Sequence, residues 1–312
     1  MPDPLVIAHL TDPHLPLGTP RIGDLMGKRA LSYANWLRRR RRLHRPEIAA
    51  AIVADLKAAE PDAIAMTGDL VNFSLESEFQ AGAAWLRDLG PPELVGVIPG
   101  NHEGLTRGFT QRMMRHWAPY LSGDDGRPGF PWLRRRGPVA LIGLSSAVAT
   151  PPLMASGRVG AEQCAALDRI LETTGREGLC RVILVHHAPT EMSIWRKALR
   201  DRAALVDVIQ ARGAELILHG HTHRADLSWI DTRSGRVPVI GAPSASMTPL
   251  PGHDQGAWRR LAIERASNGW HLTLTERRVT RVGTLENGAA LHFALPGGMD
   301  AGAALAPSAA SP

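Results

Sequence analysis

Residues 5–14 read LVIAHLTDPH and set a pattern that repeats along the chain. The apolar run Leu5 to Leu10 ends abruptly in Thr-Asp-Pro-His, so that Asp12 and His14 follow it directly. Short continuous apolar runs bounded by turn-forming residues predict strands that are buried on both faces. Four more runs end in the same way: residues 63–66 before Asp69, 94–98 before Asn101 and His102, 182–185 before His186, and 216–218 before His221 and His223.

Helix-like segments separate these runs and give the chain an alternating order. They are predicted at residues 46–59, 75–89, 160–174 and 201–211. Strands that alternate with helices indicate an α/β fold. After Gly220 the helical segments cease, and this change predicts a second sheet that packs on the first without helical crossovers. Its strands are expected at residues 227–231, 237–241, 258–264 and 270–276, the last two joined by the hairpin turn Asn268-Gly269.

Composition and length predict one globular domain. Of the 312 residues, 44% are hydrophobic and 21% charged, which is ordinary for a folded protein. We expect the domain to span residues 1–295 and a tail rich in Gly, Ala, Ser and Pro, 296–312, to be disordered. Apolar runs stay below the roughly 18 to 20 residues of a membrane span. Only two cysteines, Cys164 and Cys180, and no leader-like start favour the cytoplasm.

The polar residues that follow the strands form a candidate metal site. In an open α/β sheet, ligands bind beyond the carboxyl ends of the strands, so these residues can meet although they are distant in sequence. Carboxylate, amide and imidazole donors without a thiolate suit Mn²⁺, Fe or Zn²⁺. Asp12 and His14 are two residues apart, as are His221 and His223, and on extended backbone each pair points to one side. A carboxylate that bridges two ions about 3.5 to 4 Å apart forms a clamp for phosphoryl transfer.

Five sequence blocks carry a family resemblance. In order, they resemble the signature of the calcineurin-like metallophosphoesterases, over roughly residues 5–245. The resemblance implies an α/β fold, a four-layer αββα sandwich of two mixed sheets flanked by helices, and the activity of a metal-dependent phosphoric ester hydrolase. The blocks are Asp12-Pro13-His14, Gly68-Asp69, Gly100-Asn101-His102-Glu103, His186-His187-Ala188-Pro189 and Gly220-His221-Thr222-His223.

The resemblance also implies a role for each site residue. His102 protonates the leaving group or stabilises the transition state, and His187 is the alternative to His186 as a ligand. Two metal ions are the implied cofactors, Mn²⁺ foremost with Fe or Zn²⁺ as alternatives, and a hydroxide between them is the nucleophile. Of the remaining histidines, His44 is expected to be structural or at the surface. The implied ligands are Asp12, His14 and His223 for the first ion, Asn101, His186 and His221 for the second, and Asp69 for both.

Residues 21–45 form a basic, amphipathic helical insertion after the first ligand pair. Trp36 precedes the run Arg38–Arg42, a pattern typical of a contact with an anionic membrane or ligand. The alternative is a solvated helix that packs Trp36 against the domain. A net charge of +6 favours anionic partners in general. A single basic run without a binding module is weak evidence for nucleic acid, so no specific nucleic-acid binding is expected.

Together these features predict a cytoplasmic phosphodiesterase that contacts the inner membrane face through Trp36 and Arg38–Arg42. The chain is similar to the small bacterial branch with class III cyclic-nucleotide phosphodiesterases and phospholipase-C-like enzymes. Phospholipid head groups are the expected substrate, and a 3′,5′-cyclic nucleotide is the alternative. Lipid pyrophosphate hydrolysis and a non-catalytic scaffold are minor alternatives. The sequence leaves the exact substrate, the native metal pair and the oligomeric state open.

Overall fold

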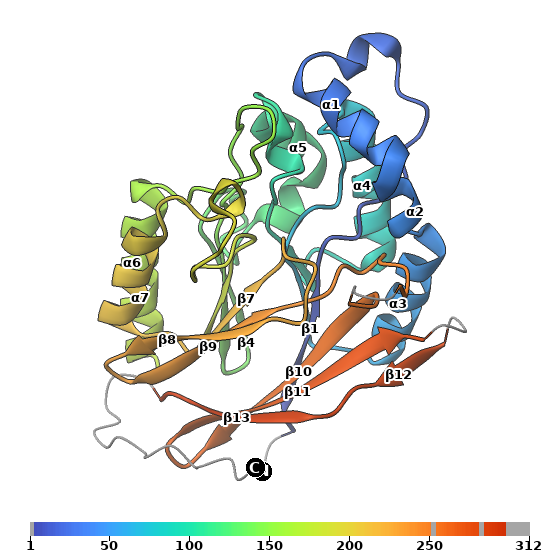
Figure 1. Cartoon of the computed structure of the whole chain (residues 1–312). Helices are drawn as coiled ribbons and strands as arrows, with labels where there is room; N and C mark the ends of the chain where they lie inside the picture. The colour runs from blue at the N-terminus through green and yellow to red at the C-terminus, as the bar shows by residue number, and fades with distance from the viewer. Residues whose placement is uncertain (1–2, 251–253, 281–283, 298–312) are drawn as a thin grey trace.

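The computed structural model describes residues 3–250, 254–280 and 284–297. Two mixed sheets pack against each other, and helices cover their outer faces (Figure 1). This arrangement confirms the expected four-layer α/β sandwich. Most of the predicted tail, from residue 298 onward, lies outside the described residues. Within the described part of the chain, no helix is long and apolar enough to cross a membrane.

The first sheet has seven strands in the order β12-β11-β10-β1-β2-β3, with β13 beside β11. Its central strand β1 pairs in parallel with β2 and antiparallel with β10, so the run LVIAHL has hydrogen-bonded neighbours on both sides. The predicted hairpin at Asn268-Gly269 is confirmed, since it joins β10 to β11. The strands are β1 Leu5–Leu10, β2 Ala63–Met66, β3 Val95–Val97, β10 Ala257–Ala266, β11 Gly269–Val279, β12 Leu285–Asn287 and β13 Leu291–Leu295.

The second sheet has six strands in the order β4-β5-β6-β7-β9-β8. The prediction that all strands after Gly220 form a sheet of their own is therefore wrong. Instead β9 extends the second sheet beside β7, and β10 covers the edge of β1 that β2 leaves free. Pairing at both edges satisfies backbone groups that an edge strand exposes. The strands are β4 Trp132–Arg136, β5 Val139–Gly143, β6 Cys180–Leu184, β7 Leu216–His219, β8 Leu227–Thr232 and β9 Gly235–Gly241.

Three buried apolar layers hold the sandwich together. The central layer lies between the sheets and joins side chains such as Ile7 of β1 and Leu218 of β7. A second layer lies between the first sheet and its helices, and a third between the second sheet and α6 and α7. Four of the helices match the predicted segments to within about two residues. The helices are α3 Pro46–Ala58, α4 Glu76–Leu89 and α5 Phe109–Trp117 on the first sheet, and α6 Ala161–Arg176 and α7 Arg202–Arg212 on the second.

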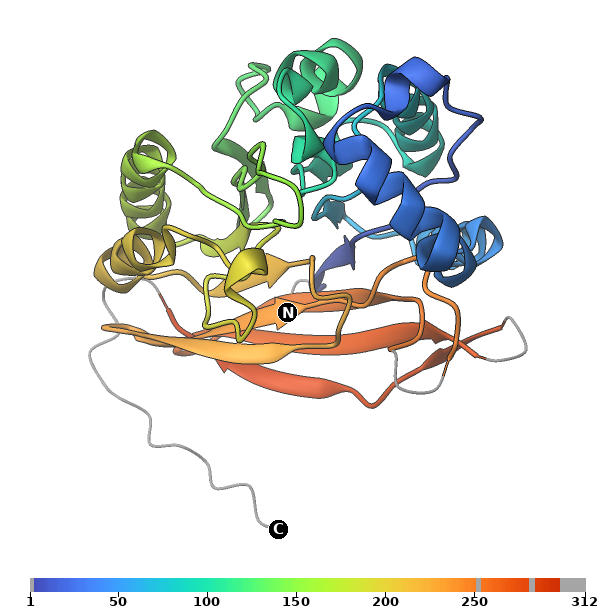
Figure 2. The same ribbon diagram turned by 45° about the horizontal axis from the view of Figure 1, so that its top comes forward.

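The insertion forms a helical arm at the end of the sandwich where the parallel strands terminate (Figure 2). Its α1 (Lys28–Asn35) continues through a π-helical turn, Trp36–Arg40, into α2 (Arg41–Leu43). The Trp36 ring is half-buried, 5.7 Å from the Tyr33 ring and 6.2 Å from that of Phe73. Trp36 thus packs against the domain, as the alternative interpretation of the insertion expects.

Candidate metal centre

Five of the seven predicted ligands lie on strained turns at the ends of the strands. Left-handed φ values are rare for non-glycine residues, and such strain concentrates at functional sites. The expectation of extended backbone from Asp12 to His14 is wrong. The peptide N–H groups of these two residues donate to the carbonyls of Gly68 and Asp69 at 3.0 and 3.1 Å, which forces a tight turn. Five predicted ligands have positive φ: Asp12 at 52°, His14 at 40°, Asp69 at 56°, His221 at 68° and His223 at 56°.

The first ligand group converges although its members come from opposite ends of the chain. His14 Nε2 lies 3.3 Å from His223 Nε2, and Asp12 Oδ1 lies 3.0 Å from the same His223 atom. The other ring nitrogen of His14, Nδ1, faces the Val71 carbonyl at 3.4 Å, which makes Nδ1 the protonated nitrogen. The Nε2 lone pair then faces the group. Acceptor atoms that gather in this way fit a cation between them.

The second ligand group has the same character. Asn101 Oδ1 lies 2.7 Å from His221 Nδ1 and 3.3 Å from His186 Nε2, and Asp69 Oδ2 lies 3.4 Å from that His186 atom. His186 Nδ1 faces the Thr67 carbonyl at 2.7 Å, so its Nε2 atom also points inward. Asp69 also groups with His14 and with Asp12, so its carboxylate lies between the two groups. The donor set therefore fits two cations with a shared carboxylate.

The buried carboxylates of Asp12 and Asp69 stabilise positively charged groups next to them. Burial opposes charge on His186, but the Asp69 carboxylate and its hydrogen bond raise the pKa of His186 to about 10. Burial likewise opposes the charge of Asp12, yet the neighbouring His223 keeps the pKa of that carboxyl well below its usual value. In a buried site the carboxylates need a positive partner, and a metal ion provides one.

The structure distinguishes the two adjacent histidines. His186 Nε2 points at Asp69 and Asn101, as described above. His187 lies beside them, with its ring 4.4 Å from that of His221, and its ligand atom groups with those of His186 and His221. Both of its ring nitrogens have other partners, however, with Nδ1 2.8 Å from Ser146 Oγ and Nε2 3.0 Å from the Ala155 carbonyl. The geometry therefore favours His186 over His187 as the ligand.

His102 lies at the wall of the same pocket. Its peptide N–H donates to Asp69 Oδ1 at 2.7 Å, and its Nδ1 faces the Asn72 carbonyl at 2.7 Å. This second contact makes Nδ1 the protonated nitrogen and turns Nε2 toward the pocket, where Arg40 Nη1 lies within hydrogen-bond distance of it. Burial, and after it the positive charge of Arg40, lowers the pKa of His102 to about 4.

Glu103 is a residue whose role the sequence analysis missed, although it stands in the block Gly100-Asn101-His102-Glu103. Its buried carboxylate accepts four peptide N–H groups at 2.7 to 3.1 Å. One belongs to Gly100 and the others to residues 69–71. Glu103 thus fastens the loop that carries Asp69 to the loop that carries Asn101.

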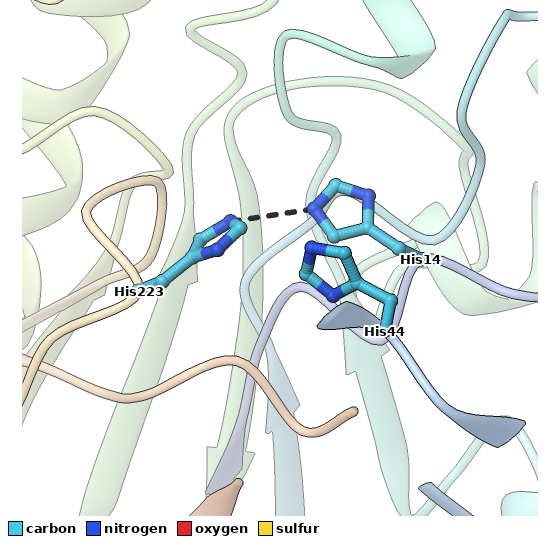
Figure 3. Close-up of side chains that lie close together, drawn as sticks. All are labelled: His14, His44 and His223. Atoms are coloured by element: carbon cyan, nitrogen blue, oxygen red, sulfur yellow. Dashed lines mark hydrogen bonds between the residues drawn. The ribbon is translucent and has the colours of Figure 1, made fainter. Parts of the chain in front are cut away.

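The insertion brings two further residues to the site. The expectation that His44 is structural or at the surface misses its position, since its ring lies 4.5 Å from that of His14 and 5.4 Å from that of His223 (Figure 3). Ligand atoms of these three histidines lie within 4.8 Å of one another. Arg40 also points inward and donates to His14 Nε2 at 3.1 Å. No local pattern marks either residue, because only the path of the arm brings them here.

The ligand groups open into a pocket of about 660 Å³ between the arm and the strand-end loops. Its walls combine cations with apolar side chains. The cations are Lys28, Arg39, Arg40, Lys197 and Arg224, and the apolar side chains are Leu31, Leu43, Leu105, Leu153, Met154 and Met247.

Comparison with known proteins identifies the family. Residues 5–225 match the family model described as calcineurin-like phosphoesterase. The chain therefore belongs to the calcineurin-like phosphoesterase family, and it is a metal-dependent phosphoester hydrolase, as the sequence blocks predict.

Individual relatives agree with this assignment. The chain is 27% identical over 220 residues to a Synechococcus protein named as a probable cyclic nucleotide phosphodiesterase, a match that covers 69% of this chain and 77% of that one. A dimetal phosphatase from Danio rerio shares the fold, with a TM-score of 0.58 and 14% identity over 91% of this chain and 99% of that chain. The purple acid phosphatase PPD1 of yellow lupin has a TM-score of 0.55 and 12% identity, over 92% and 53% of the two chains.

Proposed function

We propose that the chain is a two-metal phosphodiesterase that hydrolyses phospholipid head groups. The observation that carries this proposal is a rim of exposed apolar residues on the segments that border the pocket, two of which, Leu31 and Leu153, line it. We define this rim as Met26, Leu31, Leu153, Ile194 and Trp195, all exposed large apolar residues. Leu153 is 83% exposed and Trp195 72% exposed. Exposed apolar patches of this kind mark contact sites for membranes or amphiphilic ligands.

Hydrogen bonds connect the three segments that carry the rim. Lys28 Nζ donates to the carbonyls of Thr150 and Met154 at 3.1 and 2.9 Å, which joins the arm to the loop that contains Leu153. The peptide N–H of Ala155 donates to the Arg196 carbonyl at 2.9 Å, which joins that loop to the segment with Trp195. These hydrogen bonds therefore hold the three segments next to one another.

Positive charge complements the rim. Exposed arginines of the arm, Arg38, Arg41 and Arg42, flank in sequence the pocket-lining Arg39 and Arg40. Each basic side chain near an anionic bilayer contributes about 1 kcal/mol of binding. Because Trp36 packs inward, Trp195 replaces it in our proposal as the aromatic membrane contact. A lipid phosphodiester has both the charge and the apolar body that this pocket and its rim match.

The proposed ligands are the seven residues of the two groups, with Asp69 shared. Bound at them, two ions would polarise the phosphoryl oxygens and lower the pKa of the attacking water. The water oxygen forms the new bond to phosphorus as the bond to the glycerol oxygen breaks. His102 Nε2, which has a free lone pair because Asn72 holds the Nδ1 proton, would take up the proton that the water loses and pass it to that glycerol oxygen. The products are diacylglycerol and a phosphorylated head group.

The test uses Mn²⁺-loaded protein on vesicles of phosphatidylcholine and phosphatidylglycerol, with cyclic AMP run in parallel. We expect release of phosphorylated head groups. Changing Ile194 and Trp195 to Ser should lower this release and leave turnover of soluble bis(p-nitrophenyl) phosphate unchanged. Leu291→Ser, an equally simple change on β13, is the matched control. Equal vesicle turnover by rim and control variants would contradict the proposed substrate.

Two further variants test the membrane contact and the proton donor. Replacing Arg38, Arg41 and Arg42 with Ser should weaken binding to anionic vesicles by about 3 kcal/mol at low salt. A vesicle affinity that changes neither with these substitutions nor with the salt concentration would contradict the membrane contact. His102→Ala should lower kcat by about 10² to 10⁴ with unchanged metal content. Loss of metal together with activity would instead make His102 a ligand.

A second candidate substrate is a 3′,5′-cyclic nucleotide. The Synechococcus relative, named for this activity, is the observation that favours it. Turnover of cyclic AMP with inert vesicles would establish this alternative and exclude the lipid substrate.

A further inference from the structure

Arg40 is a residue of the arm whose side chain enters the metal site. Its Nη2 donates to His14 Nε2 at 3.1 Å, and its Nη1 lies within hydrogen-bond distance of His102 Nε2. Its neighbours in the arm, Arg39 and Arg41, are exposed. The guanidinium therefore lies between a proposed ligand and the proposed proton donor.

The backbone of the arm is built to aim this side chain. Arg40 is the last residue of the π-helical turn, and such turns add a residue that changes which side chains face inward. π-helical turns are rare and often occur at functional sites. The arm is also fastened at both ends. Arg29 donates to the carbonyls of Phe73 and Ser74 at 2.9 and 2.7 Å, and the Arg45 N–H donates to the Ser246 carbonyl at 2.8 Å.

The contact between Arg40 and His14 competes with metal binding. A guanidinium keeps its charge in proteins, so it always donates and never accepts. His14 Nε2 has one lone pair in the plane of its ring, and that lone pair cannot serve an N–H group and a metal ion together. A metal bound at the first group would therefore displace Arg40 from His14. Because the arm is fastened at both ends, the displaced guanidinium would stay at the pocket wall near His102.

We infer that Arg40 binds the phosphoryl group of the substrate. Its planar fork of N–H groups matches two oxygens of a phosphate, which a single ammonium group does not. Next to His102, the guanidinium lies where the leaving group and the phosphoryl oxygens must meet. This inference rests on the proposed metal-dependent phosphodiester hydrolysis, but it does not depend on the lipid nature of the substrate.

The test compares Arg40→Ala and Arg40→Lys with Arg45→Ala, an exposed arginine of the same arm. The substrate is bis(p-nitrophenyl) phosphate with Mn²⁺-loaded protein. We expect Arg40→Ala to lower kcat/KM by about 10²-fold to 10³-fold, Arg40→Lys to recover part of the loss, and Arg45→Ala to stay within about twofold of the wild type. Calorimetry should show weaker binding of inorganic phosphate to Arg40→Ala. Metal-free Arg40→Ala should bind Mn²⁺ as tightly as the wild type or more tightly, since a competing cation is removed.

Two outcomes would overturn the inference. One is equal kcat/KM and equal phosphate binding in Arg40→Ala and Arg45→Ala. The other is a loss of Mn²⁺ affinity in Arg40→Ala, which would make Arg40 a support of the metal ligands. If wild-type protein hydrolyses no phosphoester, the proposed function fails, and the phosphate-binding comparison still decides the role of Arg40.

Discussion

A single methyl group at Gly100 should disable the second metal group without unfolding the protein. Gly100 precedes Asn101, and a Cβ atom added to Gly100 would lie 2.7 Å from His186 Nε2 and closer still to Asp69 Oδ1. Ordinary van der Waals contact for a Cβ atom begins near 3.4 Å. Gly100 does not have a positive φ, so alanine fits its backbone and the conflict is confined to these side chains.

The magnitude follows from the overlap. The nearest His186 atom, Cε1, would lie 2.6 Å from the added Cβ, so relief of this contact requires a displacement of about 0.8 Å, the difference between 3.4 and 2.6 Å. Metal–ligand distances tolerate only about 0.2 Å. We therefore expect Mn²⁺ affinity at this group to fall by at least about 10²-fold, and kcat to fall by a similar factor. Overpacking should lower the free energy of unfolding of the metal-free protein by about 1 to 3 kcal/mol.

The assay is calorimetric titration of metal-free protein with Mn²⁺, together with urea unfolding followed by circular dichroism. Gly18→Ala is the matched control, because a Cβ atom at Gly18 has no neighbour within 4 Å among the described residues. Wild-type Mn²⁺ affinity in folded Gly100→Ala would refute the reasoning, since His186 and Asp69 would then not need their observed positions to bind metal.

Three further predictions concern the metal ligands and the core. His186→Ala should lose about half of the bound metal and all turnover, whereas His187→Ala should keep its metal stoichiometry. Metal analysis of both variants is the measurement, and loss of metal from His187→Ala but not from His186→Ala would contradict the assignment. Removal of metal with a chelator should lower the thermal midpoint, and Mn²⁺ at about 100 times its Kd should restore about 2.7 kcal/mol of stability. Arg181→Ala should lower the free energy of unfolding by about 3 to 5 kcal/mol, because it leaves the fully buried Glu215 without its ion-pair partner; a urea midpoint equal to the wild type would contradict this.

The sequence predicted most of the strands and their relation to the site. The run Leu5 to Leu10 forms β1 at its predicted bounds, and Asp12 and His14 follow it. Patterns of this kind are local, since buried strands and turns impose residue types on their own positions. The ordered blocks at the strand ends added the family, which matching of residues 5–225 confirmed.

Other features depend on contacts that local patterns do not encode. β4 escaped detection because its sequence WLRRR looks exposed, yet Arg134 is buried and donates to the carbonyls of Val95 and Tyr120 at 2.7 and 3.2 Å. The distribution of β8 to β11 over two sheets likewise depends on which sheet edges remain free after the first strands have paired.

The chain by itself determined its family, its α/β order and the identity of the residues that gather at the strand ends. Only the tertiary structure revealed the left-handed backbone at Asp12 and His14, the inward position of Trp36, and the approach of Arg40 and His44 to the site. The physical reason is that strand and turn preferences act between near neighbours. The direction of the arm instead depends on a π-helical turn and on distant hydrogen bonds that exist only once the chain has folded.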